Sequence, residues 1–386
     1  MTVAALCAVG AEKAVSNEIR KLSLKVQDGG GYGRVRFLAD TEGLYRALMG
    51  LRAADRLLLE VASFKALDFD ALFDNTREQA WEDYIPPRLG FKVSKVRTNR
   101  SVLRAETSIQ AIVHKAAAER LCQKRGIRRL PSPVESEHTI EAELRVYIEK
   151  DQVSLLLDLT GEPLYKRGYR TQGGPAPLRE TTAAAIILLS GWRRKYPLYD
   201  PFCGSGTIAI EAAMYAWDIA PGIGRRFAID KLSLGSRETE RKVRQEFLEK
   251  VDFSRLVRIG GSDSDSALAA AAGENLSRAI ALAKDKWQQE AAAPLFKVLP
   301  MEEAEFPGEA GFIITNPPYG RRLGDVESAE KGYAEMGKLK RNFPGWKLVL
   351  ISDNTGFESF FGRKADSCRE ITNGAINSYL YEYNVL

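Results

Sequence analysis

The chain has only two histidines, His114 and His138, among 386 residues. A site built on several histidines cannot be assembled from two, which excludes most metallohydrolase chemistry and most histidine-based nucleophile relays. The four cysteines lie far apart and include no CxxC pair, so they fit neither a disulfide framework nor a zinc site. We therefore expect reduced thiols, no metal, and catalytic groups of other residue types.

Long apolar segments are also missing. The longest nearly uncharged run, 181–192, is far shorter than the roughly 20 residues that a membrane-spanning helix needs. The opening MTVAALCAVGAEK has no basic segment before its apolar stretch, so we interpret it as a strand and not as a signal peptide. These features predict a cytoplasmic protein without a membrane anchor.

The composition is that of a globular chain, with 45% hydrophobic and 28% charged residues. A chain of this length fits two or three domains, since single cores rarely grow past roughly 250 residues. Up to about residue 160 the apolar pattern predicts a mixture of short strands and helices. The predicted elements of this part lie at 3–9, 12–22, 33–37, 41–49, 91–96, 107–124, 141–148 and 152–159.

The second part of the chain has an α/β pattern, in which apolar strands alternate with longer helices. Such alternation predicts a mostly parallel sheet that is covered on both faces. One predicted strand ends at Asp200, and further strands are predicted at 257–260, 296–299, 311–315, 347–352 and 378–383. Helices are expected at 178–192, 208–217 and 267–287.

Positive charge is concentrated in one segment. Residues 88–130 contain twelve Lys or Arg against two Glu, a net charge of +10, while the whole chain carries +5. Such a concentration is what binding to phosphates requires, because each contact releases condensed counterions. The alternative is a solvated helix face with neighbours of opposite sign. We predict nucleic-acid contacts from this segment at Arg97, Arg100, Lys115, Lys124 and Arg125.

A glycine loop follows the strand that ends at Asp200 and precedes a predicted helix. Gly204 and Gly206, in DPFCGSGT, let the backbone pass close to a ligand, and the amides at the helix start favour a polar or anionic group. This loop alone also fits a looser dinucleotide fingerprint or a plain tight turn.

A second candidate for ligand binding is Asp263 in IGGSDSD, where a strand ends in carboxylates. In an α/β crevice this is the place at which a ribose diol is held. Asp230 is a competitor because it lies nearer the expected distance beyond the glycine loop. The alternative for Asp263 is that it caps the following helix.

The third candidate is Asn316-Pro317-Pro318-Tyr319, which follows the apolar strand FIIT. Methylation of an exocyclic amine is difficult because the nitrogen lone pair is delocalised into the base. The Asn316 side-chain oxygen and the Pro317 carbonyl can draw the two N–H groups out of plane while Tyr319 stacks on an extruded base. Positioning then replaces a strong general base, which explains a site without histidine.

At these residues the chain resembles the THUMP-domain class I methyltransferases that use S-adenosylmethionine, especially the bacterial enzymes that modify guanine N2 in large-subunit ribosomal RNA. The resemblance is nearly full length. The motifs that carry it are LYKRGYR (164–170), APLRETTAAAI (176–186), DPFCGSGTIAIEAA (200–213), IAPG (219–222), GSDSD, IITNPPYG and the GFESFFGRKA…NG ending of 356–374.

The resemblance implies three domains: a ferredoxin-like domain at 1–64, a THUMP RNA-binding domain at 65–160 and a Rossmann-like class I methyltransferase domain at 161–386. It places the segment 176–181 over the methionine end of the cofactor. The cofactor residues that we predict are Ala176, Leu178, Glu180, Thr181, Asp200, Cys203, Gly204, Gly206, Thr207, Asp263, Ser264, Asp265 and Met301.

Two positions depart from the family pattern. Pro300 stands where many such enzymes have an Asp that takes the adenine amine, and Arg321 replaces a carboxylate in NPPYGRRLG. Our first hypothesis is a methyltransferase that acts on 23S-type RNA. The alternatives are a guanine in tRNA, adenine N6 as the target, and an inactive RNA-binding adaptor. A nicotinamide dehydrogenase could use the glycine loop, but it would have no need for the NPPY motif.

Overall fold

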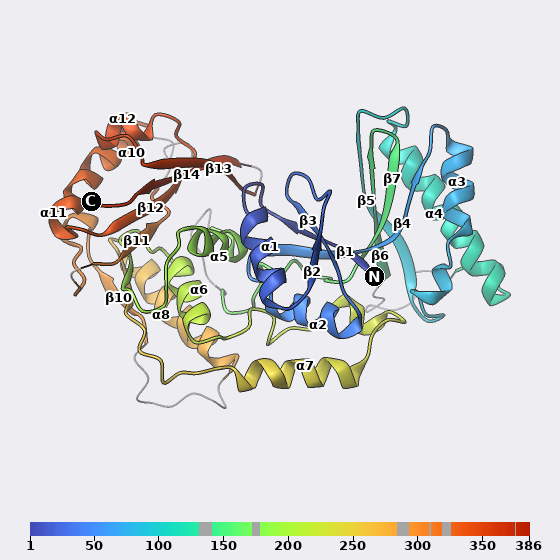
Figure 1. Ribbon diagram of the computed structural model, residues 1–386, viewed down its shortest axis with the longest axis horizontal. Helices are drawn as coiled ribbons and strands as arrows, with labels where there is room; N and C mark the ends of the chain where they lie inside the picture. Colours follow the sequence, from blue (N-terminus) through green and yellow to red (C-terminus); the bar gives the residue numbers. More distant parts are fainter. Residues whose placement is uncertain (131–140, 172–177, 284–292, 309, 319–325, 375) are drawn as a thin grey trace.

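The computed structural model contains two seven-stranded sheets at opposite ends of an elongated molecule (Figure 1). The structure describes residues 1–130, 141–171, 178–283, 293–308, 310–318, 326–374 and 376–386. Within these ranges no helix combines the length and the apolar character needed to cross a membrane. The four cysteines are free thiols, as we predicted.

The N-terminal sheet has the strand order β2-β3-β1-β4-β7-β6-β5. Strand β4 is twelve residues long; its first part pairs with β1 and its second part with β7, so one continuous sheet runs through the first 158 residues. Its elements are β1 (Thr2–Cys7), α1 (Glu12–Lys21), β2 (Lys25–Gln27), β3 (Arg34–Leu38), α2 (Thr41–Gly50), β4 (Ala54–Lys65), α3 (Phe69–Glu78), β5 (Gly90–Asn99), α4 (Glu106–Arg125), β6 (Glu141–Glu149) and β7 (Gln152–Asp158).

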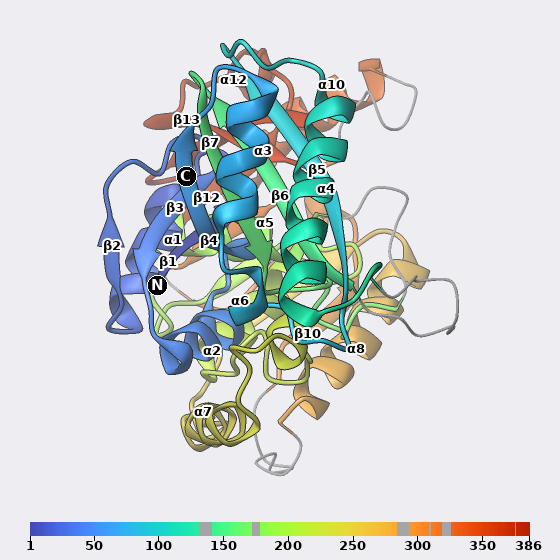
Figure 2. The same ribbon diagram turned by 90° about the vertical axis from the view of Figure 1, so that its right-hand side faces the viewer.

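Local sequence explains where several of these elements begin and end. Asp40 caps α2 by accepting the N–H of Gly43, and Gly126 ends α4 in the left-handed region at φ +63°. Helices α3 and α4 lie side by side over the half of the sheet that contains β5, β6 and β7 (Figure 2).

The predicted domain boundary between residues 64 and 65 falls at the end of β4. This boundary and the predicted domain boundary at residue 160 both stay predictions.

The C-terminal sheet has the order β10-β9-β8-β11-β12-β14-β13, with β8 to β12 parallel and β14 antiparallel to both of its neighbours. The elements are α5 (Glu180–Leu189), β8 (Leu198–Asp200), α6 (Thr207–Ala216), α7 (Arg237–Glu249), β9 (Ile259–Asp263), α8 (Ser266–Ala281), β10 (Leu295–Val298), β11 (Phe312–Thr315), α10 (Val326–Glu335), α11 (Leu339–Asn342), β12 (Lys347–Ser352), α12 (Phe357–Phe361), β13 (Ser367–Asn373) and β14 (Ile376–Tyr383). Short 3-10 helices lie at Trp81–Asp83, Ala228–Lys231, Met301–Glu303 and Met336–Lys338.

Alternate residues of the central strands enter two separate cores. Ile314 and Val349 pack with α6 and α8 on one face, while Ile313 and Leu348 pack with aromatic residues on the other. The near-continuous apolar sequence of these strands follows from burial on both faces. The structure thus confirms the predicted parallel α/β sheet.

The two halves are joined by direct contacts between their backbones. The β1–α1 loop meets β13, where the Thr372 N–H donates to the Val9 carbonyl at 3.0 Å, and the Gly222 N–H donates to the Met49 carbonyl at 2.9 Å. Gly10 has no room for a side chain, because a Cβ there would lie 2.1 Å from the Glu370 carbonyl oxygen. These contacts place the N-terminal sheet in a defined position relative to the site described next.

Candidate functional site

The glycine loop 201–206 joins the carboxyl end of β8 to α6. Gly204 and Gly206 both have positive φ, +51° and +85°, which glycine adopts without a Cβ penalty. At Gly204 a Cβ would meet no atom within 4 Å, so this side of the backbone faces open space. At Gly206 a Cβ would lie 2.9 Å from the Ala272 Cβ and 3.1 Å from the Phe296 ring.

This geometry corrects one expectation from the sequence. We expected both glycines to clear space for a ligand, but the missing Cβ of Gly206 faces the protein interior. Gly206 is the N-cap of α6, and its absent side chain lets α8 approach that helix closely. Of the two glycines, only Gly204 has its missing Cβ on the open side of the loop.

Asp263 ends β9, the strand beside β8. Its Oδ2 accepts the N–H of Gly204 at 2.8 Å and its Oδ1 accepts the N–H of Asp265 at 3.0 Å. The cap of α8 is Asp265, which accepts the N–H of Ala267. Asp263 is therefore tied to the glycine loop and does not cap the helix. Ser264 between them is exposed.

The competitor Asp230 lies at the contact between the two halves. Its Oδ1 accepts the Tyr45 hydroxyl at 3.0 Å, and its Oδ2 accepts the Phe227 N–H. Tyr45 belongs to α2 of the N-terminal sheet. The structure thus gives Asp230 a role in docking the halves, and it leaves Asp263 beside the loop.

Asp200 links the glycine loop to the segment after β11. Its buried Oδ1 accepts the Thr315 hydroxyl at 2.6 Å and the Phe202 N–H at 3.1 Å. Burial raises the pKa of Asp200 to about 7, although both hydrogen bonds act in the opposite direction. Because Thr315 directly precedes Asn316, the hydrogen bond holds the two predicted parts of the site together.

The segment Asn316-Pro317-Pro318 leaves the sheet at the carboxyl end of β11. Asn316 is half-buried, Pro317 is buried and Pro318 is exposed. Tyr319, the fourth residue of the motif, lies outside the described residues, as does Arg321.

Arg170 connects the start of α5 to the start of α6. Its guanidinium donates to the Leu178 carbonyl and to the Thr207 hydroxyl, both at 2.8 Å, and its Nε lies 3.3 Å from a carboxylate oxygen of Glu180. Thr181 donates its hydroxyl to Asp55 of the N-terminal sheet. The predicted cofactor segment is thus held by protein contacts on both sides; Ala176 lies outside the described residues.

The remaining predicted cofactor residues, Cys203 and Met301, are buried. The Cys203 thiol is buried, which raises its pKa, and it fits only because Gly261 has no side chain: a Cβ there would lie 2.7 Å from the Cys203 Cβ. Met301 is buried at the start of a 3-10 helix after β10, and Pro300 is the N-cap of that helix. Sequence analysis did not identify the role of Gly261.

A buried group of charged residues behind α6 was also not predicted. Arg167 is 2% exposed; it donates to Glu211 and to the carbonyl of Arg52. Arg52 donates to the Ile219 carbonyl, and Glu18 accepts the Arg52 N–H at 2.9 Å. Arg167 and Arg170 both lie in LYKRGYR. This motif supported the family resemblance, but the sequence analysis gave its residues no role. These contacts join α1, the loop between α2 and β4, and α6 where the two halves meet.

The predicted RNA residues of the basic segment divide into two kinds. Arg97, Arg100, Lys115 and Lys124 are exposed, although three of them stand near carboxylates: the pairs are Arg97–Glu106 at 3.0 Å, Lys115–Glu119 at 3.9 Å and Lys124–Glu82 at 3.9 Å. Arg125 donates to the carbonyls of Ile85 and Pro86, and partial burial lowers its pKa. Arg125 therefore has a structural role, and its RNA contact stays a prediction.

Sequence comparison identifies the family. Residues 167–382 match the RMKL-like methyltransferase domain, and residues 2–58 match the RlmL ferredoxin-like domain. The chain belongs to the RMKL-like methyltransferase family. This is a family of S-adenosylmethionine-dependent RNA methyltransferases, so the predicted fold class and cofactor are confirmed.

Relatives of this methyltransferase include the putative RNA methyltransferase YpsC of Bacillus subtilis (strain 168), which is 35% identical over 99% of this chain and 95% of its own length. The ribosomal RNA large subunit methyltransferase K/L of Cellvibrio japonicus (strain Ueda107) is 33% identical over 91% of this chain. The matched region covers 47% of that relative, so the chain spans about half the length of the K/L proteins.

Among solved structures, SMU.472, a putative methyltransferase complexed with SAH, superposes with a TM-score of 0.87 and 35% identity, covering 100% of this chain and 98% of its own. Among the described residues of the present methyltransferase, no group of three or more His, Cys, Asp or Glu side chains could hold a metal ion.

Proposed function

We propose that the chain transfers a methyl group from S-adenosylmethionine to the exocyclic amine of a base in structured RNA, with N2 of a guanine in large-subunit ribosomal RNA as the favoured target. The observation that carries the proposal is the hydrogen bond from Thr315 to Asp200, because it joins the glycine loop to Asn316. The K/L relatives, named as ribosomal RNA methyltransferases, support RNA as the substrate, and the SAH complex of SMU.472 supports the cofactor.

The residues around Gly204 fit this cofactor. The backbone of Gly204 is open on the side where a Cβ would stand, so a ligand can approach it closely. Asp263 already accepts two N–H groups, yet each carboxylate oxygen has a second lone pair that can accept a ribose hydroxyl. Asp200 is a buried carboxyl whose ionised form an ammonium group would stabilise. When bound, S-adenosylmethionine supplies a methyl group on a positively charged sulfur.

The chain's contribution to the reaction is the alignment of the amine. The Asn316 side-chain oxygen and the Pro317 carbonyl accept its two N–H groups and turn the lone pair out of the plane of the base, while Tyr319 stacks on the ring. Exposed cations of the basic segment, such as Arg97 and Lys124, hold the RNA backbone. Alignment of this kind needs no histidine.

The test uses ribosomal RNA from cells that lack the protein, incubated with the purified full chain and S-adenosylmethionine, then digested for mass spectrometry of the nucleosides. We expect a gain of N2-methylguanosine. Asn316→Ala should lower the rate about 100-fold by misplacing the amine, while calorimetry shows unchanged cofactor binding. Asn384→Ala, at the exposed end of the chain beyond β14, is the matched control.

The other outcomes separate the alternatives. A gain of N6-methyladenosine would mean that the target base is adenine and not guanine, and modification of tRNA alone would mean that the substrate is tRNA and not ribosomal RNA. RNA binding with no methyl gain for the wild-type chain would favour the inactive adaptor. Wild-type activity in Asn316→Ala would refute the proposed alignment.

A further inference from the structure

Tyr32 is 93% exposed, although the backbone of the loop that carries it is held by hydrogen bonds. It lies in the β2–β3 loop between Gly31 and Gly33, which have φ of +86° and +66°. The loop backbone is held at Gly33, whose N–H donates to Glu12 at 2.6 Å and whose carbonyl accepts the Cys7 N–H at 2.9 Å. Exposed apolar side chains are common, but an exposed aromatic ring that lines a cavity is a feature of binding sites.

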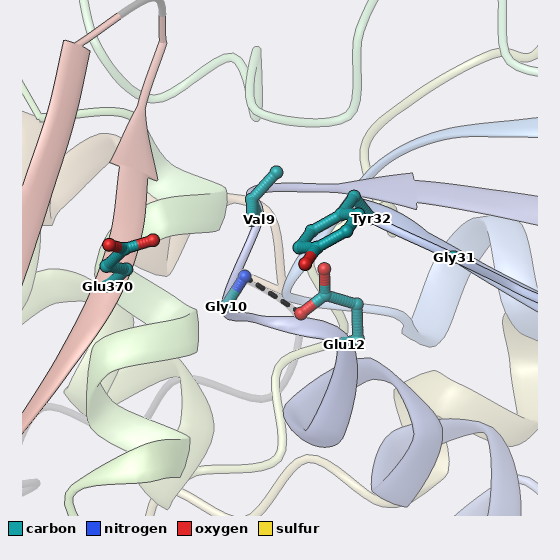
Figure 3. Close-up of a pocket in the computed structure, with 6 residues that line it drawn as sticks. All are labelled: Val9, Gly10, Glu12, Gly31, Tyr32 and Glu370. Carbon is teal, nitrogen blue, oxygen red and sulfur yellow. Dashed lines mark hydrogen bonds between the residues drawn. The ribbon is translucent and has the colours of Figure 1, made fainter. Parts of the chain in front are cut away.

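A cavity of about 450 Å³ lies beside this ring, between the N-terminal sheet and β13 (Figure 3). Its two walls have a defined spacing, since the Val9 N–H donates to the Thr372 hydroxyl at 2.9 Å and the Thr372 N–H donates back to the Val9 carbonyl. The lining is mostly apolar and comes from Val9, Gly10, Glu12, Gly31, Tyr32 and Glu370.

The two carboxylates of the cavity differ in their availability. Glu12 uses both oxygens to accept backbone N–H groups, from Gly10 at 2.8 Å and from Gly33 at 2.6 Å. Glu370 stands on the opposite wall from Tyr32; it is exposed, and it makes no side-chain hydrogen bond or ion pair within the described part of the chain. The cavity therefore offers an aromatic face and, in Glu370, a carboxylate whose two oxygens have no partner among the described residues, and this combination favours a planar group with N–H donors.

One wall of the cavity lies near the sheet edge at which Asn316 follows β11, because Glu370 is paired with Tyr379 of β14. Strand β13 carries Glu370 and ends at Asn373. The next strand, β14, begins at this edge, because its Tyr379 is paired with Ser352, the last residue of β12. Strand β11, parallel to β12, passes into Asn316 at the same edge. A chain of nucleotides that reaches Asn316 can therefore extend toward Tyr32.

We propose that this cavity binds an unpaired guanine nucleotide of the substrate RNA near the methylated base. The guanine stacks on Tyr32, and its N1–H and N2–H groups donate to the Glu370 carboxylate, whose two oxygens match two adjacent donors. The inference rests on the proposed function, because it requires RNA as the substrate.

The test measures binding of fluorescent nine-nucleotide RNAs to the full chain without cofactor, comparing all-uridine RNA with the same RNA carrying one central guanosine. Stacking on an aromatic ring contributes a factor of about 5 to 150 in affinity, so Tyr32→Ala should lose this factor and Tyr32→Phe should keep it. Glu370→Gln should remove the preference for guanosine, since it replaces one acceptor with a donor. Tyr196→Ala, at another exposed tyrosine in the methyltransferase half, is the control and should bind like wild type.

The outcomes separate this inference from the proposed function. If the wild-type chain methylates ribosomal RNA but Tyr32→Ala and Glu370→Gln leave affinity, guanosine preference and the KM for RNA unchanged, the cavity proposal is wrong and the proposed function stands. If the wild-type chain neither binds these RNAs nor methylates ribosomal RNA, both fail. A guanosine preference that survives Glu370→Gln also overturns the assignment.

Discussion

Alanine substitution at Gly204 and at Gly206 tests whether the first glycine leaves space for the cofactor and the second allows close helix packing. At Gly204, alanine must adopt the left-handed region, which costs about 1–2 kcal/mol, and it meets no protein atom. The new methyl group instead enters the space assigned to the cofactor. We expect a modest loss of stability and a large loss of affinity, by a factor of about 5 to 150 if the crowding resembles the overpacking of a core at about 1–3 kcal/mol.

At Gly206 the same substitution should act on the fold. Alanine there has the same left-handed penalty, and its Cβ is also forced to 2.9 Å from the Ala272 Cβ. Overpacking adds about 1–3 kcal/mol, which gives a total of about 2–5 kcal/mol. The valine variant would be worse, because its branches enter the contact between α6 and α8.

The two variants are compared by thermal melting without ligand and by calorimetric titration with S-adenosylmethionine. Gly206→Ala should melt at the lower temperature, and Gly204→Ala should bind the cofactor more weakly than wild type. Wild-type affinity in Gly204→Ala, or equal stability of the two variants, would refute the assignment of Gly204 to the ligand and Gly206 to packing.

Three further predictions concern charge. The pKa of Asp200 is raised in the folded state, from its ordinary 3.8 to about 7, so its contribution to stability is complete below pH 3.8 and is lost as the pH rises through 7. Melting curves from pH 5 to 8 should show this loss of stability, and Asp200→Asn should reduce the loss. Reversing the charges of Arg97, Arg100 and Lys124 should weaken RNA binding and reduce its dependence on salt concentration, while the cofactor affinity measured by calorimetry stays unchanged. If the salt dependence of RNA binding did not change, the basic segment would not be part of the RNA interface. Arg167→Met should lower stability by about 3–5 kcal/mol, because it leaves a buried carboxylate of α6 without its cation, and a melting temperature equal to wild type would contradict this.

Local pattern was a good guide to the elements and to the order of the motifs. The helix predicted at 107–124 forms at Glu106–Arg125, and the strand predicted at 311–315 forms at Phe312–Thr315. Strand β4, which joins both parts of the N-terminal sheet, was not predicted, nor was α7 in the charged stretch after residue 236. Strand β4 pairs with β1 and β7, and α7 contacts α2. These partners lie far away in the chain, so the neighbouring sequence does not indicate the contacts.

The sequence by itself determined the fold class and the family, because these depend on apolar periodicity and on short motifs. Only the tertiary structure decided which member of each pair has which role. Asp263 rather than Asp230 meets the glycine loop, Gly204 rather than Gly206 faces open space, and Arg125 is bound to backbone carbonyls. Each of these outcomes depends on contacts between segments that are distant in the chain, and local spacing does not encode the direction in which a side chain or a missing Cβ points.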